Sequence, residues 1–368
     1  MITLEHLGKI YGAGGSSAAV DDVCLTVGTG EICVLIGPSG CGKTTTMRMV
    51  NRLITPTSGR VLINGRDTAA IDTVELRRGI GYVIQQVGLF PNMTVEENIG
   101  VVPRLLGWTP ARMRARAAEL LDMVGLDAGQ FLTRFPNQLS GGQQQRVGVA
   151  RALAADPPVL LMDEPFGAID PINRAAIQDQ FLAMQQKLKK TVLLVSHDID
   201  EAVKMADRIA IFRAGRLEQA GTPDEVLTAP ANDFVAGFIG PDPTLKRLRR
   251  KRVGEVHALL AVSPGQTVEV TTDGCIGTIQ VDSAGRVVAV TAGGRALGPV
   301  TVRMECDLRV VVSELLRLAV PWLPSVDDEG YLRGVVSQAA ISRAVSVPSA
   351  MSKDAAASVG GGRNAPAR

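Results

Sequence analysis

One eight-residue stretch constrains this chain most strongly: Gly37-Pro38-Ser39-Gly40-Cys41-Gly42-Lys43-Thr44. Its spacing, a glycine, four residues and then Gly-Lys-Thr, is typical of a loop that cradles phosphate with backbone N–H groups. Glycines recur in such loops because side chains would obstruct the phosphate oxygens. An apolar run over 32–36 precedes the stretch, and an amphipathic segment over 43–54 follows it. The order predicts a strand, a phosphate loop and a helix that ends before Thr55–Pro56, within an α/β fold.

The residues of this loop have distinct predicted roles. Lys43 can reach the β- and γ-phosphates, and the hydroxyl of Thr44 can ligate Mg²⁺. The following helix directs its N-terminal dipole at the anion. Thr45 is also among the predicted nucleotide contacts. ATP and Mg²⁺ are therefore the expected ligands.

A second apolar run, 159–162, ends in Asp163 and Glu164. A strand buried on both faces presents its carboxyl end at the sheet edge where the phosphate loop also lies. Asp163 is suited to hold Mg²⁺, directly or through water, and Glu164 to polarise the attacking water. Two acids at a strand end are usually only solvated, but the phosphate loop favours the catalytic interpretation.

Further segments continue the alternation of strands and helices over residues 1–240. The runs 80–84 and 191–195 predict strands, and 176–188 predicts a helix. Between about residues 88 and 155 the pattern changes, because 112–124 and 143–153 predict helices and strand signals are few. We expect a helical subdomain inserted in the α/β core.

Five residues between the phosphate loop and the acidic strand, Leu139-Ser140-Gly141-Gly142-Gln143, resemble the signature motif of ABC ATPases. A Ser-Gly-Gly turn ahead of a helix also makes a second N-terminal anion site. The resemblance covers about residues 1–240 and implies further site residues. Tyr11 would stack on adenine, with a core tyrosine as the alternative. Gln85 would be the Q-loop glutamine, or Gln86 if the register slips by one. Ala168-Ile169-Asp170 would form the D-loop, and His197 would be the switch histidine.

The resemblance also implies a mechanism. Two copies would pack head to tail, so that the Lys43 loop of one chain and the Ser140 loop of the other clasp one ATP. Glu164 would activate water, His197 would steady the γ-phosphate, and Gln85 would link nucleotide state to the membrane subunits. The predicted catalytic residues are then Lys43, Gln85, Glu164 and His197, and the predicted metal ligands are Thr44, Gln85 and Asp163. The predicted nucleotide contacts are Tyr11, residues 37–45, Gln85, residues 140–143, Asp163 and Asp170.

Residues 81–99 and 232–240 resemble the ATPases of bacterial importers for quaternary amines such as glycine betaine, choline or carnitine. This implies permease subunits, a substrate-binding protein and a peripheral location on the cytoplasmic face of the plasma membrane. No apolar run approaches the roughly 18–20 residues that a membrane helix needs, and residues 1–12 lack the apolar core of a signal peptide. Another importer class, or an ABC ATPase outside transport, remains the alternative. The intact Lys43, Asp163, Glu164 and His197 oppose a dead ATPase.

The C-terminal part has a different texture. Pro241-Asp242-Pro243 predicts a boundary, 241–252 a basic linker, and 351–368, rich in Ala, Gly and Ser, a disordered tail. Residues 253–350 resemble a degenerate pair of cystathionine-β-synthase-type (CBS) modules of α+β structure, and 281–288 echoes 326–333. Ala340, and Arg295 in the first repeat, stand where nucleotide-binding modules carry Asp, so we do not expect this part to bind nucleotide.

The charge balance excludes one class of partner. Lys and Arg number 39 against 37 Asp and Glu, which gives no case for nucleic acid. The five cysteines show no paired metal spacing, and we expect reduced thiols.

Overall fold

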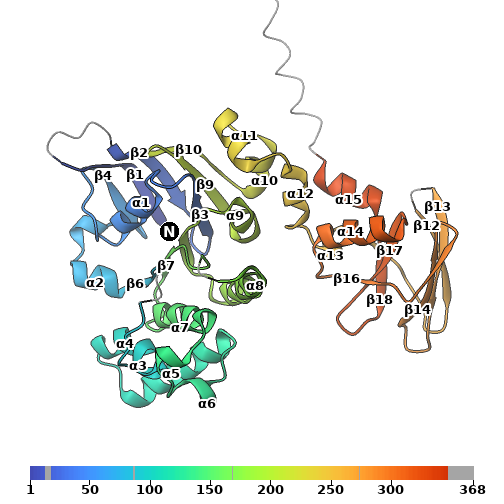
Figure 1. The fold of residues 1–368 in the computed structure, drawn as a ribbon, viewed down its shortest axis with the longest axis horizontal. Helices are drawn as coiled ribbons and strands as arrows, with labels where there is room; N and C mark the ends of the chain where they lie inside the picture. The colour runs from blue at the N-terminus through green and yellow to red at the C-terminus, as the bar shows by residue number, and fades with distance from the viewer. Residues whose placement is uncertain (13–17, 86–87, 168, 273, 347–368) are drawn as a thin grey trace, which may run out of the picture. The chain divides into compact units, whose positions relative to one another are not determined.

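The computed structural model describes residues 1–12, 18–85, 88–167, 169–272 and 274–346, and it divides into two compact units, Met1–Pro241 and Asp242–Arg368 (Figure 1). Gln86, Ala168 and the predicted tail 351–368 lie outside the described residues. Each unit is described by itself.

A six-stranded sheet forms the centre of the first unit, in the order β10-β9-β3-β8-β7-β6. The parallel strands are β3 (Ile32–Ile36), β6 (Ile80–Val83), β7 (Val159–Asp163), β8 (Thr191–Val195) and β9 (Arg208–Arg213), and β10 (Arg216–Gly221) runs antiparallel to β9. Parallel strands are buried on both faces by their crossover helices, so they are near-continuous apolar runs. The predicted α/β fold is confirmed, and the strands predicted at 32–36 and 191–195 have the predicted bounds.

Successive residues of these strands face two different cores. In β3, Val34 belongs to the core beneath the crossover helices, while Cys33 and Leu35 belong to the core on the other face. The same alternation holds in β7, where Leu160 and Leu161 face opposite cores. Complete burial raises the pKa of the Cys33 thiol to about 12.

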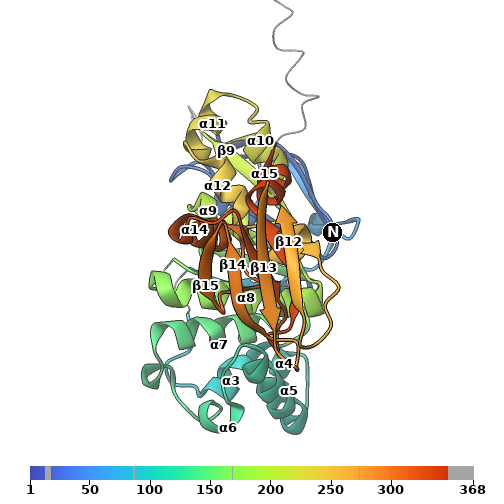
Figure 2. The ribbon, with the colours of Figure 1, turned by 90° about the vertical axis from the view of Figure 1, so that its right-hand side faces the viewer.

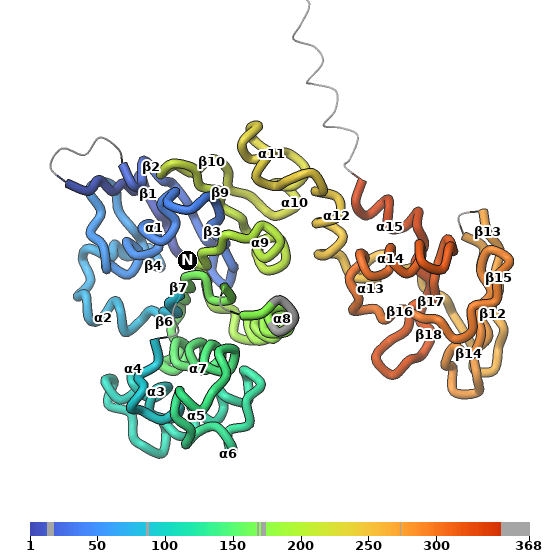
Figure 3. Tube along the Cα trace, in the orientation of Figure 1, coloured from blue at the N-terminus to red at the C-terminus, as the bar shows by residue number. Residues whose placement is uncertain are grey.

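An antiparallel sheet covers one face, in the order β2 (Ala18–Val27), β1 (Ile2–Ile10), β4 (Ser58–Ile63) and β5 (Arg66–Asp67). Helix α1 (Lys43–Val50) lies against it, with Met47 and Val50 fully buried (Figure 3). The prediction that this helix runs to 54 is wrong. Arg52 takes a left-handed backbone with φ 52°, and the N–H groups of Leu53 and Ile54 turn back to the carbonyl of Arg48.

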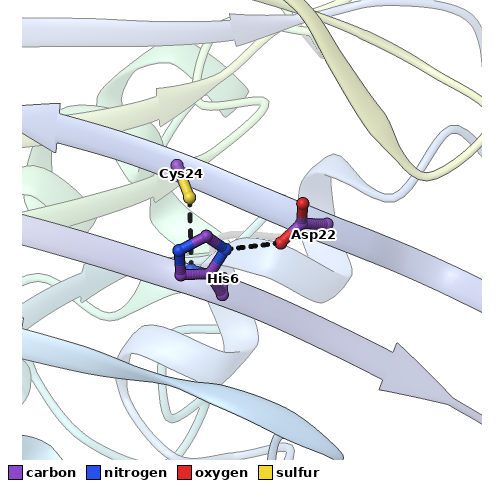
Figure 4. A group of neighbouring side chains, drawn as sticks. All are labelled: His6, Asp22 and Cys24. Carbon is purple, nitrogen blue, oxygen red and sulfur yellow. Dashed lines mark hydrogen bonds and ion pairs between the residues drawn. The ribbon is translucent and has the colours of Figure 1, made fainter.

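Bulges interrupt the β1–β2 ladder and gather His6, Asp22 and Cys24 on its exposed face (Figure 4). His6 Nδ1 lies 2.7 Å from Asp22 Oδ1, and the backbone N–H of His6 donates to Cys24 Sγ over 3.3 Å. His6 and Asp22 both have left-handed backbones, with φ of 49° and 52°. The His6–Asp22 contact and the N–H···S contact hold these three residues together at the bulge.

A helical region connects β6 to β7 and occupies one end of the unit (Figure 1). It contains α3 (Val95–Ile99), α4 (Val101–Leu105), α5 (Pro110–Met123), α6 (Ala128–Phe131) and α7 (Gly141–Leu153), and its described residues include no strand. The predicted helices 112–124 and 143–153 correspond to α5 and α7, which each begin two residues earlier because Thr109 and Ser140 cap them. The remaining helices are α2 (Thr73–Arg78), α8 (Pro171–Leu188), α9 (Ile199–Met205), α10 (Pro223–Thr228) and α11 (Asp233–Ile239).

The second unit has two four-stranded sheets. One is a meander of β12 (Thr267–Thr272), β13 (Cys275–Val281), β14 (Val287–Ala292) and β15 (Arg295–Gly298), whose face is visible in Figure 2. The other has the order β11 (Ala258–Leu259), β18 (Leu332–Ser337), β17 (Trp322–Val326) and β16 (Val302–Arg303). Helices α12 (Pro243–Leu248), α13 (Val253–Val256), α14 (Leu308–Leu318) and α15 (Gln338–Val345) complete it.

The internal repeat corresponds to two hairpins with the same turn. Asp282 and Asp327 open the turns and accept from later backbone N–H groups, and Gly285 and Gly330 close them with φ of 88° and 87°. The turns meet, since Leu332 N–H donates to the carbonyl of Gly285 over 3.2 Å.

The two halves differ after their hairpins. The predicted equivalence of Arg295 and Ala340 holds by spacing along the chain only, because Arg295 opens strand β15 whereas Ala340 lies in the first turn of α15.

The basic run was predicted to be a linker, but the structure includes it in the second unit. Leu248 is buried in the core of that unit, and Arg252 donates to the carbonyl of Glu305 over 3.1 Å. Among the described residues, no helix combines the length and apolar character needed to cross a membrane.

Thiol reactivity tests the packing of the central sheet. The thiolate is the reactive form of cysteine, and burial disfavours the thiolate of Cys33. Iodoacetamide at pH 8 should therefore label the exposed Cys24 and leave Cys33 unmodified until the protein unfolds. Peptide mass mapping with and without denaturant measures both sites, with Cys24→Ser as the control for assignment. Equal labelling rates in the folded protein would contradict the burial of β3.

Candidate functional site

The carboxyl ends of four adjacent parallel strands bring the predicted residues together. The phosphate loop follows β3, Gln85 follows β6, Glu164 follows β7, and His197 follows β8. Ligands of open α/β sheets bind at this edge. The resulting cavity has a volume of about 520 Å³ and is lined by Ala19, residues 39–45, Gln85, Glu164 and His197. Its volume lies within the roughly 300–1,000 Å³ that is usual for small-molecule sites.

The side chain of Lys43 is bound to the backbone of the phosphate loop. The buried ammonium group of Lys43 donates to the carbonyls of Gly37 and Pro38 over 2.7 and 3.0 Å. Gly37 and Pro38 are therefore structural members of the loop, outside the cavity lining. Gly37 has φ 145°, and a Cβ there would lie 2.2 Å from the carbonyl oxygen of Phe212.

Helix α1 begins at the loop without a side-chain cap. Its N-cap residue, Gly42, has φ 102° and offers no side-chain acceptor, and its first turn has no acidic residue. By contrast, Ser140 caps α7 and Asp198 caps α9. The free N–H groups and the helix dipole of α1 therefore favour an anion at this position.

Asp163 and Thr44 meet at the floor of the cavity. The hydroxyl of Thr44 donates to Asp163 Oδ1 over 3.1 Å, and Asp163 itself is buried. Burial raises the pKa of Asp163, while the Thr44 hydrogen bond and the charges of Arg48 and Lys43 oppose that rise. A buried carboxylate beside a hydroxyl is a suitable oxygen donor set for a divalent cation.

Glu164 lies between Gln85 and His197. Gln85 Nε2 donates to Glu164 Oε2 over 2.8 Å, and His197 Nδ1 is 3.6 Å from the same oxygen. Glu164 has an unusual left-handed backbone, with φ 45°, and its N–H donates to the carbonyl of Val195 on β8. Such strain in a non-glycine residue is concentrated at functional sites. Gln85 is thus in the cavity, and Gln86 lies outside the described residues.

The signature-like residues form a separate cavity. Ser140 accepts from the backbone N–H of Gln143 over 3.3 Å, and the Gln143 side chain accepts from the Ser140 N–H over 2.9 Å. This cavity is lined by Ser140, Gly141, Gly142 and Gln143 together with Asp170, and it shares no lining residue with the first. Within one chain, then, the Lys43 loop and the Ser140 loop line different cavities.

The lining of the first cavity differs from the sequence analysis at two positions. Tyr11 does not line it; its side chain is exposed, with Lys9 Nζ 5.2 Å from the ring centroid. Ala19 lines the cavity and was not predicted. A small residue on a strand distant in sequence carries no signal of that contact.

Comparison with known proteins relates the whole chain to one family. The model of the ABC transporter family matches residues 20–167. The osmoprotectant import ATP-binding protein OsmV of Salmonella typhimurium is 54% identical over 360 residues, covering 92% of this chain and 94% of that protein. The glycine betaine/carnitine/choline transport ATP-binding protein OpuCA of Bacillus subtilis is 42% identical over 368 residues, covering 93% and 95%.

A solved structure agrees with the first unit. It is a dimeric ATP-binding cassette in a post-hydrolysis state with ADP and phosphate bound, 36% identical with a TM-score of 0.54. The match covers 60% of this chain and 98% of that chain.

The backbone of the phosphate loop can be tested with one methyl group. Gly37→Ala would press Cβ against the Phe212 carbonyl, so we expect at least tenfold weaker binding of a fluorescent ATP analogue, since a loss of about 1.4 kcal/mol is already tenfold. Gly65→Ala is the matched control, because Gly65 also has a positive φ, 79°, but open space around it. Equal affinity in the two variants would contradict the assignment of this loop.

Proposed function

The chain belongs to the ATP-binding subunits of ABC transporters, and on that basis we propose how its residues bind ATP, hydrolyse it and energise import. It hydrolyses ATP to ADP and phosphate as a subunit of an importer complex for quaternary-amine osmoprotectants, the activity of the relatives it matches almost end to end. The observation that carries the residue assignments is the meeting of Lys43, Thr44, Gln85, Glu164 and His197 in one cavity.

In the proposed complex, the phosphates of ATP occupy the loop over residues 37–45. The N–H groups at the start of α1 receive the phosphate oxygens, and Lys43 exchanges its carbonyl partners for the β- and γ-phosphates. Tyr11 turns to stack on the adenine, which its exposure permits.

Mg²⁺ would be held by Thr44 and Asp163, with Gln85 as a further ligand. Hydroxyl, carboxylate and carboxamide oxygens are the donors that this ion prefers, and Thr44 and Asp163 already meet at 3.1 Å. When bound, the ion would neutralise charge on the phosphate oxygens.

Glu164 is the proposed general base. Its carboxylate faces the cavity with Gln85 and His197 on either side, so it can receive a proton from a water aligned with the γ-phosphate. His197 then serves as a hydrogen-bond donor to the γ-phosphate, since a carboxylate is already placed to act as the base.

A head-to-tail homodimer would complete the site. Within one chain the Lys43 and Ser140 loops line different cavities that share no residue, which fits a site in which the Ser140 loop comes from another copy. Ser140 to Gln143 would then close over the nucleotide, with Asp170 at the interface. A dimeric solved relative supports this arrangement.

The partners follow from the family. Membrane permease subunits would form the channel, a substrate-binding protein would deliver the osmoprotectant, and this subunit would sit on the cytoplasmic face of the bacterial plasma membrane. Gln85 would convey nucleotide state to the permease.

The second unit is proposed to regulate hydrolysis. Its second half has the order β16-α14-β17-β18-α15, and its first half shares only the hairpin, which supports a degenerate CBS-like pair. In the second half, Ala340 stands at the start of α15 in place of the acidic residue that adenosine-binding modules use, and the first half has a strand instead of that helix.

Replacing the base tests the mechanism. Glu164→Gln keeps the size and hydrogen-bonding shape of the side chain but removes the proton acceptor, so steady-state hydrolysis should fall by about 10²-fold or more while ATP-dependent dimers persist. Phosphate release and size-exclusion chromatography with ATP measure the two properties. Turnover close to that of the wild type would refute the base assignment.

Removing the second unit tests its role. Every residue lining the Lys43 cavity lies in the first unit, so a chain truncated after Pro241 should retain basal ATPase activity but respond differently to salt. The full-length Trp322→Ala variant, which empties a fully buried position of the second unit, should change the salt response similarly. An unaltered salt response in both proteins would remove the regulatory role.

A further inference from the structure

A buried carboxylate next to the cavity has no role in the mechanism above. Glu201 lies on α9, is only 9% exposed, and accepts hydrogen bonds at both carboxylate oxygens. The hydroxyl of Ser196 donates to Oε2, and Gln178 Nε2 donates to Oε1 over 3.2 Å. Burial raises the pKa of Glu201, while the hydrogen bonds from Ser196 and Gln178 oppose that rise.

The Ser196 contact holds the turn that carries His197. Ser196 comes immediately before the histidine, and its Oγ accepts from the N–H of Asp198, immediately after it, over 3.0 Å. The Ser196 N–H also donates to the carbonyl of Leu35, at the end of β3, over 3.0 Å. The hydroxyl of Ser196 therefore links the two residues that flank His197, and Glu201 orients that hydroxyl.

The Gln178 contact leads to the second cavity. Gln178 is buried on α8, and Arg174, one turn earlier, donates to the carbonyl of Ile169 over 2.9 Å while its positive charge also acts on Glu201. Ile169 and its neighbour Asp170 both line the Ser140 cavity. Two side chains of α8, one helical turn apart, thus contact Glu201 and the Ile169 carbonyl, and α8 connects the His197 turn to the residues that would face the partner's nucleotide.

We propose that Glu201 is a positioning residue that fixes His197 for hydrolysis and joins its turn, through Gln178 and Arg174, to the Ile169–Asp170 segment. This rests on the proposed function, in which His197 contacts the γ-phosphate and Asp170 lies at the dimer interface. A change of the nucleotide bound in one cavity would then shift residues of the other cavity through α8. A carboxylate suits this position because one side chain can accept from the turn and from α8 at once.

A matched pair of buried glutamines on α8 provides the test. Gln178 contacts Glu201, whereas Gln185, at the other end of the helix, contacts the carbonyls of Gly30 and Lys190. We expect Glu201→Ala and Gln178→Ala to lower kcat roughly tenfold with KM for ATP within about twofold, because a misplaced group slows the chemical step more than it weakens binding. Gln185→Ala should keep the wild-type kcat, with thermal unfolding recorded for all variants.

Two further variants separate positioning from stability. Glu201→Gln can still accept from Ser196 and can donate to a rotated Gln178 amide, so it should restore most of kcat. In a His197→Ala background, Glu201→Ala should cause no further loss, since its effect passes through the histidine.

The outcomes distinguish the two proposals. If His197→Ala turns over at the wild-type rate, the role of His197 in the proposed function fails. If His197→Ala lowers kcat but Glu201→Ala has the same kcat as Gln185→Ala, only the positioning role of Glu201 is overturned. The same holds if the loss of kcat in the double variant equals the product of the two single losses. If Glu201→Ala does not fold, Gln178→Ala and Glu201→Gln decide the question in the same way.

Discussion

The parallel pairing of β3, β8, β7 and β6 is the constraint on which the rest of this protein depends. Parallel neighbours end at the same edge of a sheet, so residues as far apart along the chain as Lys43 and His197 converge there without any further device. Lys43, Gln85, Glu164 and His197 each lie a few residues beyond such a strand end. Because both faces of these strands are buried, their register cannot slip by one residue without exchanging the two cores.

The cavity retains local features that would be costly without a ligand. Helix α1 has no side-chain cap, Asp163 is a buried carboxylate, and Glu164 has a left-handed backbone. By contrast, side chains cap helices α2, α3, α5, α7 and α9 of the first unit. In the proposed complex, phosphate oxygens and a cation would contact these groups, so that ligand binding would stabilise the fold.

Each chain has two unlike cavities, and in the proposed dimer this asymmetry would let a subunit respond to its partner. The Lys43 cavity contains the phosphate loop and the proposed base Glu164, whereas the Ser140 cavity contains a capped helix end beside Asp170. Helix α8 contributes Gln178 to the Glu201 network, and its first turn holds the Ile169 carbonyl. The proposed coupling therefore needs no large rearrangement within the chain, only small displacements of a packed helix.

The sequence by itself determined the nucleotide loop, the acidic strand end, the parallel α/β class and the family, because these depend on residue types at fixed short spacings. It placed β3 and β8 at their observed bounds but extended α1 past Val50, since the left-handed turn at Arg52 carries no signal in the apolar period. The internal repeat was visible in the sequence, but the strand that follows one copy and the helix that follows the other were not predicted. Only the tertiary structure decided that Ala19 lines the cavity, that Glu164 contacts Gln85 and His197, and that Glu201 joins α9 to α8. Those contacts join residues distant along the chain, and their geometry comes from packing, which no local pattern of residues encodes.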